Sequence, residues 1–169
     1  MHDSLYDRLA IYRPVIPVGH SELGYLPGTL DEKLGPWMAA VLDAVTALTE
    51  RRHQDDALRT VEQLTASRKL SMESVTFLRG RSLQRSFILV DEAQNLEPTT
   101  LKTILTRVGE GSKIVFTGDT SQIDAPYLSE FNNAIQVLIE TFAGQTCFGH
   151  VRLTSCERSR VADLAARLL

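Results

Sequence analysis

The sequence predicts an α/β domain built on a mostly parallel sheet. Short apolar runs alternate with stretches of helical periodicity, which is the pattern of strands connected by helices. The two strongest runs, residues 86–91 and 113–118, are largely apolar, as expected for strands that helices cover on both faces. Ligands of such sheets bind at the carboxyl ends of the strands, so polar residues at those ends are candidate site residues.

The first third of the chain predicts one strand, one loop and two helices. The apolar run Leu9–Tyr12 is a short strand that ends before Pro14, because proline cannot donate to a sheet ladder. Residues 13–35 are rich in proline and glycine and predict a long ordered loop, and loops of that length are usually functional. Pro36 fits the first turn of a helix, and a second, more polar helix is expected over residues 54–66.

The middle of the chain supplies the two strong strands and the helix between them. A weak strand is expected at residues 75–77, ahead of the first strong strand. The helix between the strong strands opens at Pro98 and closes at Gly109, with apolar residues at helical spacing between the two.

The remaining residues predict a helix, a strand and a final helix. The first helix covers residues 129–143 and turns Phe131 inward, the strand covers residues 148–154, and the last helix covers residues 159–168. We find no repeat and no linker, so residues 1–169 are treated as a single domain.

Composition limits the class of protein. The 43% hydrophobic and 23% charged residues are ordinary for a globular protein, and no apolar run approaches the roughly 20 residues of a membrane-spanning helix. The net charge of −3 does not favour strong nucleic-acid binding by the chain as a whole. Residues 1–4 lack the features of a secretory signal, and Cys147 and Cys156 stand apart as expected of free, buried thiols. A cytoplasmic location without a membrane partner is expected.

An acidic pair follows the first strong strand. Asp91 and Glu92 match the Walker B arrangement, in which the first acid holds Mg²⁺ through water and the second acts as general base on the attacking water. Such a pair can equally cap the next helix or face solvent. The pattern Asp-Glu-x-Gln, completed by Gln94, matches the water-activating motif of one helicase-like ATPase branch. In that role Gln94 would contact the γ-phosphate or the attacking water.

A second polar group follows the other strong strand. Gly118 and Asp119 can form an ordinary turn, since this dipeptide is common in turns. In the functional interpretation Asp119 contributes to nucleotide binding, and Gln122 is a sensor that hydrogen-bonds the γ-phosphate. A connecting helix of about ten residues allows the two strands to be adjacent and parallel, which would place Glu92 and Gln122 at one sheet edge.

Four arginines are candidates for phosphate contacts, because a guanidinium can donate two hydrogen bonds to one phosphate. Arg13 follows the first strand and is assigned to nucleotide binding. Arg158 follows the last predicted strand and could act as a finger at the γ-phosphate. Arg79 and Arg81 flank a glycine and could bind a nucleic-acid backbone. Each of them could also be a solvated surface residue.

The phosphate-binding motif Gly-x-x-x-x-Gly-Lys-Ser/Thr occurs nowhere in the 169 residues. Residues 19–24 have its glycine spacing, but Tyr25 and Leu26 stand where lysine and serine or threonine are needed. That loop supplies most of the affinity for a triphosphate through its backbone amides and lysine. The residues therefore predict one half of an ATPase site.

Together these motifs resemble the PhoH family, the phosphate-starvation-associated ATPases of the P-loop class. The resemblance runs from about residue 6 to the carboxyl terminus. The matching stretches are residues 12–19, 23–28, 32–33, 79–82, 87–94, 117–124, 148–153 and 157–159. The tail most resembles the branch in which this ATPase domain follows an amino-terminal PIN ribonuclease domain, and members of that branch are linked to RNA unwinding and cleavage.

The resemblance implies a RecA-like P-loop NTPase sheet, ATP and Mg²⁺ as ligands, ring-like homo-oligomers and often an RNA partner. Family members have a strand, a phosphate loop and a helix before the position of Leu9. Residues 1–169 are therefore expected to form a partial PhoH-type ATPase domain that lacks the first strand and helix of its sheet. Two strands would then lack a neighbour, and an unpaired apolar strand edge invites association. The expected function is that of an ATP-binding and ATP-hydrolysing module linked to RNA unwinding or processing.

Two other functions stay open. The chain could be a truncated, non-hydrolysing remnant that acts as a binding or oligomerisation module. It could also be a nucleic-acid translocase whose ATPase activity RNA stimulates. A local basic patch would then have to outweigh the negative net charge. The candidates for that patch are Arg68, Lys69, Arg79 and Arg81.

Overall fold

The computed structural model describes a defined part of the chain. The described residues are 5–14, 30–48, 54–78, 80, 82–153, 159–161, 164 and 168. The chain divides into two compact units, Met1–Leu138 and Ile139–Leu169, which we describe separately.

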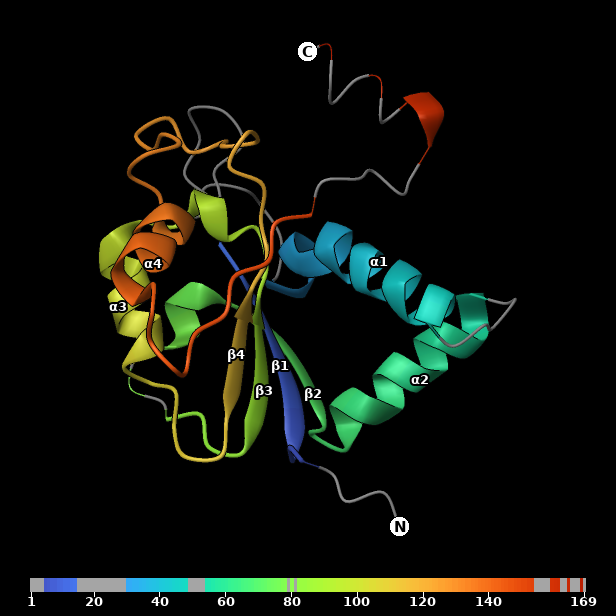
Figure 1. Cartoon of the computed structure of the whole chain (residues 1–169). Helices are drawn as coiled ribbons and strands as arrows, with labels where there is room; N and C mark the ends of the chain where they lie inside the picture. Colours follow the sequence, from blue (N-terminus) through green and yellow to red (C-terminus); the bar gives the residue numbers. More distant parts are fainter. Residues whose placement is uncertain are drawn as a thin grey trace. The chain divides into compact units, whose positions relative to one another are not determined.

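The first unit is built on a four-stranded sheet in which every neighbouring pair of strands is parallel (Figure 1). The strands are β1 (Arg8–Arg13), β2 (Leu70–Ser74), β3 (Ser86–Val90) and β4 (Lys113–Phe116). Their order across the sheet is β2-β1-β3-β4, so β1 and β3 are the central strands. The prediction of an α/β fold with a parallel sheet is confirmed, and all four carboxyl ends lie at the same edge.

The two central strands carry the core. Ala10, Tyr12, Ile88 and Val90 are at most 1% exposed, whereas β4 at the sheet margin is only half-buried. Successive side chains of a strand point to opposite faces. Ile11 accordingly belongs to a separate apolar cluster, whose buried members are Ile11, Val61 and Leu70.

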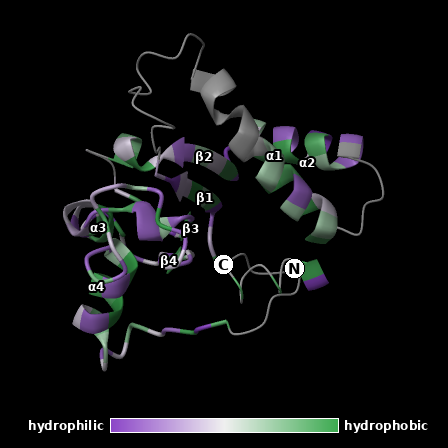
Figure 2. Cartoon of the chain, turned by 90° about the horizontal axis from the view of Figure 1, so that it is seen from above, coloured by the Kyte–Doolittle hydropathy of each residue, from purple (hydrophilic) through white to green (hydrophobic). Residues whose placement is uncertain are grey.

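Helices α1 (Leu30–Leu48) and α2 (Gln54–Ala66) connect β1 to β2 and lie on one face of the sheet, while α3 (Pro98–Leu105) lies on the other (Figures 1 and 2). Polar and apolar residues both occur along α1 and α2 (Figure 2), and apolar residues of both helices pack against the Ile11 cluster. The predicted start of the first helix at Pro36 is wrong. Leu30 begins it, because the segment before the proline contains strong helix formers and places two acids in the first turn.

The predicted weak strand at residues 75–77 is also wrong. The strand is β2, which pairs with β1 from Leu70 to Ser74, and Val75–Leu78 form the 3-10 turn η2. The Ser74 hydroxyl accepts hydrogen bonds from the backbone N–H of Thr76 (3.4 Å) and from its hydroxyl (3.0 Å). This local side-chain bonding competes with the sheet ladder and ends the strand.

After β3 the chain forms the 3-10 turn η3 (Ala93–Asn95) and then helix α3 (Pro98–Leu105). The predicted start at Pro98 is confirmed, but the helix ends four residues before Gly109. The chain there pairs with Leu83, whose carbonyl accepts a 2.7 Å hydrogen bond from Gly109. A Cβ at Gly109 would lie 2.9 Å from that carbonyl oxygen, so packing rather than helix capping requires the glycine.

Helix α4 (Ala134–Phe142) begins five residues later than predicted. The backbone N–H and hydroxyl of Ser129 bond the Asn132 side chain, and Asn133 Oδ1 accepts a hydrogen bond from the Gln136 N–H, which is the bonding pattern of an N-cap. Phe131, expected to face inward, is 83% exposed.

The predicted strand at residues 148–154 is not found in its described part, residues 148–153, which contain no sheet pairing. Val151 and Leu153 are more than 80% exposed. Of the described residues of the predicted last helix, Ser159 is not helical, whereas Arg160, Val161, Leu164 and Leu168 are. Cys147, expected to be buried, is an exposed free thiol. No helix among the described residues is long and apolar enough to cross a membrane.

Candidate active site

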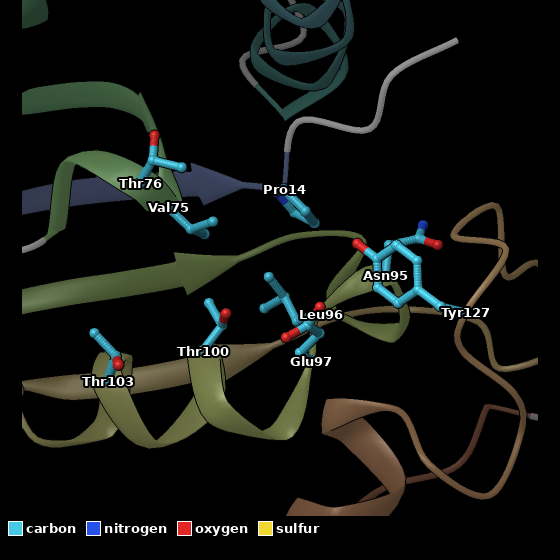
Figure 3. A pocket seen from close by; sticks show the side chains of 9 residues that line it. All are labelled: Pro14, Val75, Thr76, Asn95, Leu96, Glu97, Thr100, Thr103 and Tyr127. Carbon is cyan, nitrogen blue, oxygen red and sulfur yellow. The ribbon is translucent and has the colours of Figure 1, made fainter. Parts of the chain in front are cut away.

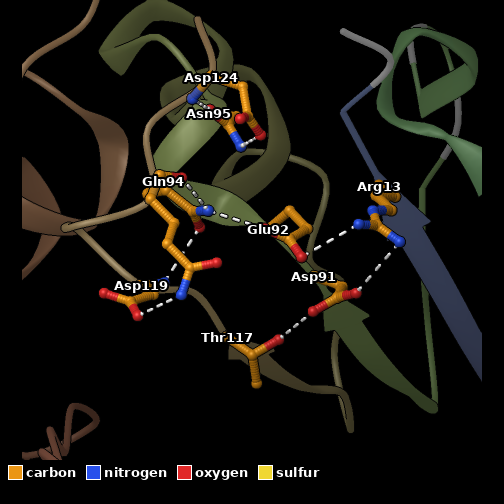
Figure 4. Close-up of polar contacts among 9 residues, drawn as sticks. Arg13, Asp91, Glu92, Gln94, Asn95, Thr117, Asp119 and Asp124 are labelled. Atoms are coloured by element: carbon orange, nitrogen blue, oxygen red, sulfur yellow. Dashed lines mark hydrogen bonds and ion pairs between the residues drawn. The ribbon is translucent and has the colours of Figure 1, made fainter. Parts of the chain in front are cut away.

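Two polar turns meet at the carboxyl edge of β3 and β4 (Figure 4). Val90 at the end of β3 pairs with Phe116 at the end of β4, so the next residues, Asp91 and Thr117, also lie side by side. Backbone hydrogen bonds extend the alignment, since the Thr117 N–H donates to Val90 and the Ala93 N–H donates to Thr117, each at 2.9 Å. The structure thus brings together the residues that the sequence places after the two strong strands.

Asp91 presents a half-exposed carboxylate. Its Oδ1 accepts a 2.9 Å hydrogen bond from the Thr117 hydroxyl, and its Oδ2 lies 4.0 Å from Nη1 of Arg13. The side chain remains 38% exposed, so the carboxylate has free capacity toward solvent at the sheet edge.

Glu92 has a left-handed backbone conformation, with φ 53° and ψ 38°. This conformation is uncommon outside glycine and marks a constrained position. Oε1 of Glu92 lies 3.0 Å from Nη2 of Arg13, and Oε2 accepts a 2.7 Å hydrogen bond from Nε2 of Gln94. The two contacts hold the carboxylate between strand β1 and the turn that follows β3.

Gln94 is fully buried and joins the two turns (Figure 4). Its Nε2 donates to Glu92 and to the Gln122 carbonyl (2.9 Å), while its Oε1 accepts from the Asp119 N–H (3.2 Å). A direct contact between Gln94 and a phosphate would require this amide to give up at least one of these bonds.

Gly118 is the residue that permits this contact. A Cβ at this position would overlap Oε1 of Gln94 and lie 2.6 Å from Cδ1 of Ile135. The sequence interpretation treated this glycine as ordinary turn chemistry and missed its packing role, because the close neighbour comes from a distant part of the chain.

Asp119 stabilises the loop after β4 through hydrogen bonds to its carboxylate. Its Oδ1 accepts hydrogen bonds from the Ser121 N–H (2.9 Å) and hydroxyl (2.7 Å), and its Oδ2 accepts a 2.9 Å bond from Nε2 of Gln122. Asp119 and Gln122 are exposed at the same edge as Asp91.

Asn95 forms a second connection that the sequence interpretation missed. Its buried Oδ1 accepts hydrogen bonds from the backbone N–H groups of Asp124 (2.8 Å) and Ala125 (3.3 Å). A lone asparagine after the acidic motif reads as a turn residue, so nothing local indicates a partner about thirty residues away.

The remaining predicted site residues, Arg79, Arg81 and Arg158, lie outside the described residues. In the described part of the chain, no group of three or more histidine, cysteine, aspartate or glutamate side chains is arranged to hold a metal ion.

Comparison with known proteins identifies the relatives of this chain. The family described as PhoH-like protein matches residues 1–167. The protein PhoH2 of Bacillus subtilis is 46% identical over 167 residues, covering 98% of this chain and 36% of the relative. PhoH2 of Thermobispora bispora is 38% identical over 96% of the chain, and a PhoH-like protein of Synechocystis is 39% identical over 71%.

The chain spans about a third of the length of these curated relatives. The two PhoH2 proteins match nearly the whole chain, its carboxyl-terminal tail included, whereas the Synechocystis protein matches less of it. The fuller match to the PhoH2 proteins agrees with the predicted resemblance to one branch of the family. The chain belongs to the PhoH-like family.

Proposed function

We propose that the chain is the ATP-binding and ATP-hydrolysing part of a PhoH-type P-loop ATPase. The observation that carries the proposal is the junction of the two turns after β3 and β4. Glu92 of the acidic pair, the buried Gln94 and the exposed Gln122 are connected there by hydrogen bonds at the ends of two adjacent parallel strands. The family membership supports a P-loop NTPase fold around this junction.

The donor set at Asp91 fits Mg²⁺. Magnesium is usually held by one or two carboxylates together with phosphate oxygens and water, rather than by a cage of protein ligands. Asp91 offers a hard, half-exposed carboxylate that Thr117 orients. Asp91 would accept hydrogen bonds from the water shell of the ion. When bound, Mg²⁺ would neutralise negative charge that develops on the transferred phosphate.

Glu92 is proposed as the general base. Its carboxylate is fixed by Gln94 on one side and Arg13 on the other, and positioning of this kind is what a water-activating group needs. Arg13 balances the charge of both acids and is proposed to contribute to nucleotide binding, because its guanidinium is one-third exposed at the same edge.

Gln122 is proposed as the γ-phosphate sensor and Asp119 as the residue that orients it. The Gln122 side chain is held by Asp119, while its backbone carbonyl accepts a hydrogen bond from Gln94. A movement of Gln122 toward a phosphate would therefore be transmitted to Gln94 and to Glu92. Arg158 is proposed as an arginine finger at the γ-phosphate, from the family resemblance alone.

For the fold, we propose a RecA-like sheet whose phosphate-loop strand pairs with the outer edge of β4. Strands β1 and β3 already have neighbours on both sides, so no gap lies between them. Strand β4 ends the described sheet next to the turn after β3, residues 91–95, which we call the acidic turn. A strand added there would carry its loop toward Asp91 and Gln122. From the family resemblance we also propose ring-like assembly and an RNA partner, with Arg79 and Arg81 on the RNA backbone.

A second candidate function is that of a non-hydrolysing binding or oligomerisation module. The observation in its favour is that the phosphate-loop motif does not occur in the 169 residues. The same open edge of β4 would then serve association with another chain.

Turnover distinguishes the two functions. ATP hydrolysis is measured for the chain and for a version extended at its amino terminus by the strand, phosphate loop and helix of a PhoH2 relative. The first proposal expects Mg²⁺-dependent hydrolysis in the extended version. It also expects Glu92→Gln to abolish turnover while nucleotide binding persists, because the amide cannot take a proton. Absence of hydrolysis in a folded extended version supports the second function, and an active Glu92→Gln variant refutes the base assignment.

A further inference from the structure

A pocket of about 400 Å³ lies beside the acidic turn, at the carboxyl edge of the sheet (Figure 3). The segments that follow all four strands contribute to its wall, although none of the site residues predicted from the sequence is among its described lining residues. The lining residues are Pro14, Val75, Thr76, Asn95, Leu96, Glu97, Thr100, Thr103 and Tyr127.

The topology of the sheet explains where the pocket lies. The connection from β1 runs outward to β2, while the connection from β3 runs the opposite way to β4. Neighbouring strands whose connections diverge leave a crevice at their carboxyl ends, which is the usual ligand position in open α/β sheets. Pro14 after β1 and Asn95 after β3 stand on either side of that point (Figure 3).

The pocket and the acidic site share one turn. Glu92 and Gln94 belong to the acidic site, and the next residues, Asn95 to Glu97, line the pocket. Asn95 also holds the loop after β4 through Asp124 and Ala125. A molecule bound in the pocket therefore contacts the same short segment that fixes the proposed base.

The lining chemistry selects the class of ligand. The described lining includes three threonines, the carboxylate of Glu97 and apolar surface from Pro14 and Val75, and none of these nine described residues is a lysine or arginine. These residues supply no positive charge for a phosphate. Hydroxyls and a carboxylate can accept hydrogen bonds from sugar hydroxyls and base amino groups. Tyr127, which is 64% exposed, offers an aromatic ring as a stacking surface at the same pocket.

We propose that this pocket binds one nucleotide of single-stranded RNA through its ribose and base. Sugar 2′-hydroxyls distinguish RNA from DNA, and unpaired bases stack on aromatic side chains. This inference deepens the proposed function, and rests on it, by giving the RNA partner a defined site next to the proposed catalytic turn. Binding there links RNA contact to Glu92 through the Asn95 segment.

The test is fluorescence anisotropy with a labelled oligouridylate of about a dozen nucleotides, a length that spans a site of this kind. Tyr127→Ala is expected to weaken binding about ten-fold, in line with the loss of one stacked base. Tyr127→Phe should retain most of the affinity. Phe131→Ala is the matched control, because Phe131 is an exposed aromatic residue that does not line the pocket.

Two further readouts separate this site from non-specific charge. Because the lining contacts are not to phosphate, Tyr127→Ala should leave the salt dependence of binding unchanged between about 50 and 200 mM salt. Thr100→Val should reduce the preference for RNA over the matching oligodeoxynucleotide. Far-UV circular dichroism checks that each variant is folded.

The proposal is overturned if the parent chain does not bind the RNA, if Tyr127→Ala binds like the parent, or if Phe131→Ala loses as much. ATP turnover is measured independently, in the version extended by the phosphate loop. Tyr127-dependent RNA binding without turnover would refute the ATPase proposal and leave the RNA site standing. Turnover without Tyr127-dependent RNA binding would refute the RNA site and leave the ATPase proposal standing.

Discussion

Replacing Gly118 with alanine tests the buried contact between the acidic turn and the loop after β4. The added Cβ would overlap Oε1 of Gln94 and lie 2.6 Å from Cδ1 of Ile135. Overpacking of this kind costs about 1–3 kcal/mol of unfolding free energy. Urea unfolding followed by far-UV circular dichroism should therefore show a midpoint lower by about 0.5–1.5 M, for a denaturant slope of about 2 kcal/mol/M.

A double-mutant cycle assigns that loss to Gln94. Gln94→Ala removes three hydrogen bonds and leaves the Asp119 N–H without its partner, which we expect to cost about 3 kcal/mol. In the Gln94→Ala background the overlap at residue 118 is largely relieved, so Gly118→Ala should cost at least about 1 kcal/mol less than in the parent. Additive losses would refute the inferred contact, and so would a Gly118→Ala variant as stable as the parent.

Two further predictions concern single contacts. Asn95→Ala should lower the free energy of unfolding by about 1–3 kcal/mol, because the backbone N–H groups of Asp124 and Ala125 lose their acceptor; a loss below about 0.5 kcal/mol, the size of a surface substitution, would contradict this role. The hydrogen bond from Arg85 lowers the pKa of the exposed Asp7 carboxyl below its usual value. Arg85→Ala should therefore raise that pKa in an NMR titration, and an unchanged pKa would show that the pair does not form in solution. Because the Asp7 pKa is depressed in the folded state, any stability from this pair is present above the unfolded-state pKa and is lost as the pH falls through the folded one.

Strong local patterns predicted the elements that carry the site. The apolar runs before Asp91 and Gly118 are strands β3 and β4, and their adjacency follows from the short helix that connects them. The acidic turn and the Asp119 loop could therefore be placed together from sequence, since parallel strands joined by one crossover end at the same edge.

Features that depend on individual side-chain hydrogen bonds or on distant partners could not be predicted in this way. Ser74 ends β2 through its own side chain, and Asn133 caps α4 after a segment that has helical periodicity but a competing Ser129–Asn132 bond. The burial of Gln94 depends on the absence of a side chain at Gly118. These are tertiary and capping interactions that override hydrophobic periodicity.

Calorimetric titration with the nucleotide measures whether the edge formed by Asp91, Glu92 and Gln122 is a magnesium–nucleotide site, as proposed above. Mg-ATP and ATP without metal are titrated into the chain and into the version extended by a phosphate loop, each with and without Asp91→Asn. We expect the extended version to bind Mg-ATP and Asp91→Asn to weaken this binding about 10–100-fold, as expected for a group that holds the metal through water. Asp91→Asn should not weaken the binding of metal-free ATP. Equal Mg-ATP affinity in the extended version and in its Asp91→Asn variant would refute the magnesium site.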